Sequence, residues 1–121
     1  MGARVNFVFK DGTDHSVVLY SHWGADSWSY DIANAINHAS RRIQMDDTSY
    51  ATRMMISYLI SESVLEETGY GIYAAGPETM FFDEAVIIDM VNKTVNDKPF
   101  SEFIQESFFA ENAGAEGSVL A

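Results

Sequence analysis

Residues 5–21 read VNFVFKDGTDHSVVLYS, and this stretch decides the fold because it predicts an N-terminal β-hairpin. Within it, residues 5–10 alternate between apolar and polar side chains with only Val8 out of pattern, which is typical of a strand with one buried face. The pair Asp11-Gly12 predicts a turn, and residues 15–21 are rich in β-branched and aromatic side chains. We therefore expect two antiparallel strands joined by a short loop.

Two helices are predicted after the hairpin. Apolar residues recur at helical spacing from Asp26 to Ile43, with Asp26 or Ser27 as the N-cap. A second helix is predicted to begin after Asp46-Asp47 and to stop before Gly69, which suits the position that follows a helix end. Because this second helix is apolar over much of its circumference, we expect it to be central.

The rest of the chain predicts two strands, at residues 70–75 and 85–91, and a short helix at residues 97–108. The order β-β-α-α-β-β-α predicts an α+β fold with a mainly antiparallel sheet of about four strands and the two central helices packed on one face. We expect a single domain over residues 1–109, followed by an acidic flexible tail over residues 110–121.

Composition excludes several classes of protein. The chain has 121 residues, which fits one domain, and it has no cysteine, which excludes disulfides, iron–sulfur clusters, thiolate zinc sites and cysteine nucleophiles. No segment approaches the roughly 18 uninterrupted apolar residues that a membrane span needs, so no membrane partner is expected. Residues 1–4 lead into a strand without the apolar core of a signal peptide, so the expected location is the cytoplasm.

The negative charge lies in the second half of the chain. Residues 1–60 hold 6 acids and 5 bases, whereas residues 61–121 hold 12 acids and 2 bases, and the net charge is −11. This sign opposes phosphate, so direct nucleic-acid binding is not expected. The simpler explanation is solubility, or a salt-rich cytoplasm in which acidic surfaces are common. The sharper one is an acidic face that docks on a basic protein partner, with Glu102 and Glu106 as the expected contacts.

The segment Tyr20-Ser21-His22-Trp23-Gly24 is the most function-like pentapeptide, because it places an imidazole, a hydroxyl and an indole at a strand end. Ser21 and His22 are neighbours that point to opposite faces of a strand, so they make a poor nucleophile pair. The structural alternative is that Trp23 covers the edge of the core and His22 bonds a backbone carbonyl. We predict no catalytic residues and lean against an enzyme.

Arg53 lies on a polar stripe of the second predicted helix, formed with serines at helical spacing. We expect it to pair with an internal carboxylate, for which Glu66, Glu67 and Asp89 are the candidates. The alternative is an anionic small molecule held by a guanidinium fork. The ligand-binding residues of that alternative are Tyr20, His22, Arg53, Glu67 and Thr68.

No metal or cofactor is expected. His15, His22 and His38 lack the spacing of metal ligands, and Asp46-Asp47 is better explained as a helix cap. Self-association stays open, because edge strands and the pair Phe108-Phe109 both offer surface.

Three segments together resemble a family of small proteins encoded in phages, prophages and related mobile elements. They are Leu19–Gly24 (LYSHWG), Tyr50–Arg53 (YATR) and Glu67–Ile72 (ETGYGI), and the resemblance spans about residues 3–95. It implies a phage-associated setting in the host cytoplasm and carries no catalytic residues over. It favours a protein that binds and modulates a host component, including a counter-defence inhibitor.

Two hypotheses from different classes follow. The first is a non-enzymatic, phage-associated accessory protein that binds a host protein through its acidic surface. The alternative is a small-molecule-binding or hydrolytic protein with a polar site around His22, Arg53 and Glu67.

Overall fold

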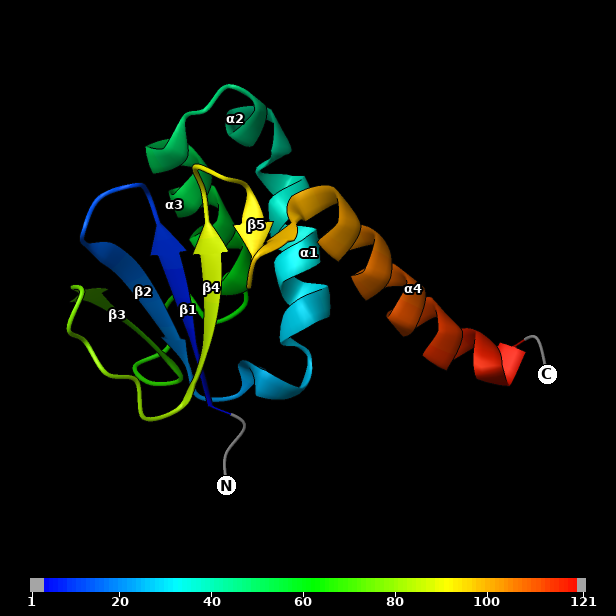
Figure 1. The fold of residues 1–121 in the computed structure, drawn as a ribbon. Coiled ribbons are helices and arrows are strands. Elements are labelled where there is room, and N and C mark those ends of the chain that lie inside the picture. Colours follow the sequence, from blue (N-terminus) through cyan, green and yellow to red (C-terminus); the bar gives the residue numbers. More distant parts are fainter. Residues whose placement is uncertain (1–3, 120–121) are drawn as a thin grey trace.

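The computed structural model describes residues 4–119, with side chains described for residues 4–24 and 26–109. The strands are β1 (Val5–Lys10), β2 (Ser16–Ser21), β3 (Tyr70–Ala75), β4 (Glu84–Asp89), β5 (Thr94–Val95) and β6 (Lys98–Pro99). The helices are η1 (Gly24–Asp26), α1 (Trp28–His38), α2 (Ser40–Gln44), α3 (Thr48–Leu59) and α4 (Phe100–Val119). The strands form one six-stranded sheet in the order β3-β2-β1-β4-β5-β6 (Figure 1).

The predicted N-terminal hairpin is confirmed. Strands β1 and β2 pair antiparallel over their full length, with Val5 opposite Ser21 and Lys10 opposite Ser16. Gly12 turns the chain between them with a φ of 93°, a backbone conformation that L side chains rarely adopt. The turn signal at Asp11-Gly12 therefore predicted the strand pair correctly.

The α+β class is confirmed, but the sheet is mixed and has six strands, where about four were predicted. Strand β1 pairs with β4 in parallel, because the segment 76–83 carries the chain from β3 across β2 and β1 to the start of β4. Strands β5 and β6 have two residues each, which is too short for alternation to mark them in the sequence.

The two faces of the sheet are covered differently. Helices cover one face, and the core between them includes Phe7, Leu19 and Ile88. The opposite face, called here the open face, carries a second small cluster built on Val8 and Val18, against which part of the segment 76–83 packs. Val8 broke the alternation of β1 because both faces of the strand bury apolar side chains.

The predicted helix over residues 26–43 is divided in two, since α1 ends and α2 begins around Ala39. The next helix was predicted to run almost to Gly69, but α3 ends at Leu59. Beyond that end, Leu65 is 94% exposed, so it does not extend the buried face of α3. The shorter helix also explains why Glu66 and Glu67 do not oppose a helix dipole: they lie in the connection to β3.

The last helix begins and ends later than predicted. Lys98 and Pro99 form β6 instead of a first helical turn, and α4 begins at Phe100. Aromatic contacts to α1 hold its first turns, with Trp28 stacked on Phe103 at 5.8 Å between ring centroids. Its backbone continues to Val119 and projects beyond the sheet in Figure 1.

The predicted tail over residues 110–121 therefore overlaps a helix. Residues 110–116 include three alanines and two glutamates, which favour helix. Their side chains and residues 120–121 lie outside the described part of the chain, and the flexibility of the tail stays a prediction. Within residues 4–119, no helix is both long enough and apolar enough to cross a membrane.

Candidate binding surface

The pentapeptide Tyr20–Gly24 begins within β2 and is hydrogen-bonded to the residue that precedes β3. The backbone N–H of His22 donates to the carbonyl of Gly69 at 2.9 Å, and His22 Nδ1 lies 3.1 Å from the Tyr20 hydroxyl. The rings of His22 and Trp23 meet edge to face, with centroids 4.5 Å apart. Trp23 is 65% exposed, so the prediction that it covers the core edge is wrong. Tyr20 and His22 thus belong together, as predicted, at one end of the open face.

Arg53 does not join them. Tyr20 lies opposite Asn6 in the sheet register and its side chain leaves from the open face, whereas α3 packs on the helix-covered face. Arg53 is exposed, and its Nη1 donates to Ser57 Oγ at 3.0 Å. Among the described residues Arg53 forms no ion pair, so the prediction that it pairs with an internal carboxylate is wrong. The polar stripe of α3 faces solvent instead.

Asp89, one of those expected partners, has a different role. Its carboxylate accepts hydrogen bonds from the backbone N–H groups of Val91 and Asn92 and from the Asn92 side chain. Burial opposes ionisation, but these hydrogen bonds and the charge of Lys10 together hold the pKa of Asp89 below its usual value. Asp89 therefore caps the turn after β4.

Glu67 and Thr68 are exposed in the segment that leads into β3. Gly69 follows with a φ of 106°, and a Cβ atom there would lie 3.0 Å from Trp23 Nε1. The backbone conformation therefore favours glycine at this junction, and a side chain there would also press on the neighbouring indole. Of the five predicted ligand residues, the structure joins Tyr20 to His22 and leaves Arg53 on the other side of the sheet.

Strand β3 was predicted at residues 70–75, where it lies, but sequence reasoning missed its position at the edge of the sheet. Within residues 4–119 its one strand neighbour is β2, and Ile72 on it is 63% exposed. Charged residues and proline usually protect a sheet edge from pairing, and the sequence YGIYAA of β3 contains neither. That absence was visible in the sequence, but the edge position was not, because strand order depends on distant pairings.

Strand β3 is anchored from the open face. The Tyr73 hydroxyl donates to Asn6 Oδ1 at 2.8 Å, so its side chain reaches across β2 to the central strand β1. Asn6 is only 4% exposed. Burial, and then the charge of Asp83, raise the pKa of Tyr73, which keeps its hydroxyl protonated as a donor.

Acidic segments border β3 in the sequence on both sides. Residues 61–84, called here the acidic edge, contain six acids and no basic residue. Apolar side chains are exposed among these acids, including Leu65 at 94% and Phe82 at 99%. Along the sequence, the acidic edge therefore combines a strand with one unpaired edge, exposed apolar groups and one sign of charge. Its last two acids, Asp83 and Glu84, lie at the start of β4, beyond β2 and β1 from β3.

The predicted contacts on α4 are partly neutralised within the chain. Lys98 forms an ion pair with Glu106, and this hydrogen bond raises the pKa of Lys98 and lowers that of Glu106. Glu102 is exposed on the preceding turn and adds to the field at Lys98. A partner that binds here must displace or share Lys98.

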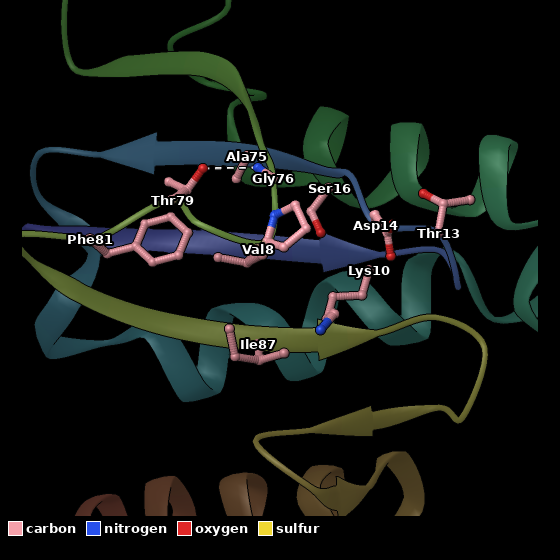
Figure 2. Close-up of a pocket in the computed structure, with 11 residues that line it drawn as sticks. Val8, Lys10, Thr13, Asp14, Ser16, Ala75, Gly76, Thr79, Phe81 and Ile87 are labelled. Atoms are coloured by element: carbon pink, nitrogen blue, oxygen red, sulfur yellow. Dashed lines mark hydrogen bonds between the residues drawn. The ribbon is translucent and has the colours of Figure 1, made fainter.

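Figure 2 shows a cleft of about 260 Å³ on the open face, beneath the strap formed by residues 76–81. Its floor includes Val8 and Ile87. Thr79, which lines it, has its hydroxyl engaged by the backbone N–H of Gly76 at 2.8 Å. None of the predicted site residues lines this cleft.

Over the described part of the chain, no group of three or more histidine, aspartate or glutamate side chains is placed to hold a metal ion. A scan against protein-family models, a search of curated proteins and a search of solved structures each found no match to this chain.

Proposed function

We propose that this protein is a non-enzymatic binding protein that docks on a basic protein surface through the acidic second half of its chain. In the phage-associated setting that the sequence resemblance implies, the partner is a protein of the host, and the binding modulates it, for example in counter-defence. The host cytoplasm is the location that goes with this proposal.

The acidic edge is the observation that carries the proposal. Its six acids have no basic residue among them in the sequence, and exposed apolar residues alternate with these acids along the chain. Apolar contacts supply binding energy, and a uniform charge steers and selects the partner. Glu66 and Glu67 are exposed and form no ion pair with a described residue, whereas Glu106 is paired with Lys98. We therefore assign the binding charge first to Glu66 and Glu67.

A small-molecule site is the second candidate, and the contact between Tyr20 and His22 favours it. A guanidinium would have to come from elsewhere, since Arg53 belongs to the other face of the sheet. Arg53→Ala should then leave any anion binding at His22 unchanged. Anion binding that is kept in Arg53→Ala and lost in His22→Ala, with the fold intact, would favour this candidate.

The test uses the full chain immobilised and exposed to bacterial lysate, because a partner is then selected under competition. We expect a basic protein to be retained at about 50 mM salt and released at about 500 mM, where screening shortens the range of charge interactions to a few ångström. The double variant E66K/E67K should lose the partner, and the double variant E102K/E106K is the matched control with the same charge change. Retention that is equal at both salt concentrations and in all variants would contradict the proposal.

A further inference from the structure

We propose that β3 accepts an extended segment of the partner as a seventh strand, and that this segment carries lysine or arginine on both sides of a short apolar centre. The inference rests on the proposed function, because it names the chemistry by which the acidic edge binds its basic partner. Binding by charge alone needs no backbone hydrogen bonds, whereas strand addition to β3 does.

The backbone of β3 offers unpaired groups in a regular row. In an antiparallel pair, hydrogen-bonded and non-hydrogen-bonded residue pairs alternate. The hydrogen bond from His22 N–H to the Gly69 carbonyl makes His22 and Gly69 a hydrogen-bonded pair. By alternation, Gly71 and Tyr73 also bond to β2. The N–H and C=O groups of Tyr70, Ile72 and Ala74 therefore point away from the sheet. An added strand would satisfy these groups.

A cleft runs beside this row on the helix-covered side of the sheet. It has a volume of about 400 Å³ and lies between β3, β2 and α3. Its apolar wall is formed by Phe9, Val17, Ile56 and Ile72, and Asp11 and Arg53 line it with one charge of each sign. Every second side chain of an added strand would point to this side, and apolar side chains there would cover Ile72.

Charge decides which strand fits. Glu66 and Glu67 precede β3, and Glu78 follows it. Pairing β3 with the same strand of a second copy would set like charges against each other: antiparallel pairing brings Glu66 and Glu67 to the copy's Glu78, and parallel pairing brings each acid to its own counterpart. A segment with basic residues at both ends places opposite charges at both ends instead. The occupant is thus a basic strand of another protein.

The probe is a short synthetic peptide with an alternating valine–threonine centre and paired lysines at both ends, carrying a fluorescent label. Its affinity for the full chain is measured by anisotropy. A second peptide has the same sequence but N-methyl groups on the edge that would bond to β3. We expect the N-methylated peptide to bind at least about tenfold more weakly, because methylation removes the donors and leaves the charge unchanged. A peptide with glutamates in place of the lysines should not bind.

Two variants of the protein test strand addition by changing β3 and not the peptide. Ala74→Pro removes one outward N–H and no bond to β2, and proline is tolerated on edge strands, so peptide affinity should fall about tenfold while the fold is kept. Ala74→Thr keeps the N–H and is the matched control, with affinity expected within about twofold of the unsubstituted chain.

The outcomes separate this inference from the proposed function. Equal binding of the two lysine peptides would overturn strand addition and leave binding by charge standing. Binding of the glutamate peptide would overturn the charge argument and the proposed function with it. A dimer in sedimentation whose formation Ala74→Pro abolishes would show that a second copy occupies β3, which also overturns the inference.

Discussion

Replacing Tyr73 by phenylalanine should loosen the outer strand of the sheet by a calculable amount. The hydroxyl lost is the donor to Asn6 Oδ1, at 2.8 Å, and Asn6 is 4% exposed. Leaving a buried acceptor without its donor costs about 1–3 kcal/mol. Because Tyr73 is itself partly exposed, water can reach the hydroxyl position, and the lower part of that range, about 1–2 kcal/mol, is the expected loss.

The assay is urea unfolding followed by circular dichroism, in a double-mutant cycle with Asn6→Ala. With a slope of about 1.5 kcal/mol per molar urea, the loss corresponds to a midpoint lower by about 0.7–1.3 M. In the Asn6→Ala background the same Tyr73→Phe change should cost less than about 0.5 kcal/mol, since its partner is already absent. An equal loss in both backgrounds would refute the anchoring of β3 to β1 through this hydrogen bond.

Three further perturbations test the core, the junction before β3 and the acid response. Leu19→Ala should lower the free energy of unfolding by about 3 kcal/mol in the same urea assay, because Leu19 is fully buried between sheet and helices; a loss below about 1 kcal/mol would contradict that placement. Gly69→Ala should destabilise by about 1–2 kcal/mol because the φ of 106° strains any L side chain, and it should alter the fluorescence of Trp23 because the new methyl group, 3.0 Å from Nε1, makes the indole shift. An unchanged emission spectrum would count against it. Asp89 has a lowered pKa in the folded chain, so its contribution is present above its unfolded value of about 3.9 and is lost as the pH falls through the folded pKa. The stability gap between the unsubstituted chain and Asp89→Asn should therefore shrink below about pH 4, and a gap independent of pH would oppose this role.

Local patterns in the sequence were enough for the hairpin and the class of fold. The alternation of residues 5–10 and the glycine at the turn act within a few residues of each other, so they needed no tertiary information. The cap of α3 is of the same kind: Asp47 accepts a hydrogen bond from the backbone N–H of Tyr50, as its position before the helix predicted.

The missed features depend on contacts between distant segments. The parallel pairing of β1 with β4 is set by where the segment 76–83 crosses the sheet, and no residue of either strand encodes it alone. Strands β5 and β6 lie among residues with positive φ, such as Lys93 and Asn96, where two-residue strands leave no periodic signal.

The candidate site was partly predictable for the same reason. Tyr20 and His22 are two residues apart, so their contact follows from local strand geometry. The spacing of Arg53 correctly put it on a polar stripe, but spacing along one helix does not tell which face of the sheet that helix covers. The exposure of Ile72 likewise required the strand order, since an interior strand with the same sequence would be buried.

Hydrogen exchange of single β3 amides, recorded by NMR with and without the lysine-ended peptide, tests the central claim most directly. The amides of Gly71 and Tyr73 bond to β2 and should be protected in both samples, which makes them the internal control. The amides of Ile72 and Ala74 point outward and should exchange fast in the free chain and at least about tenfold more slowly in the complex. Fast exchange at Ile72 and Ala74 in a saturated complex, or new protection on α4 alone, would contradict binding at the acidic edge.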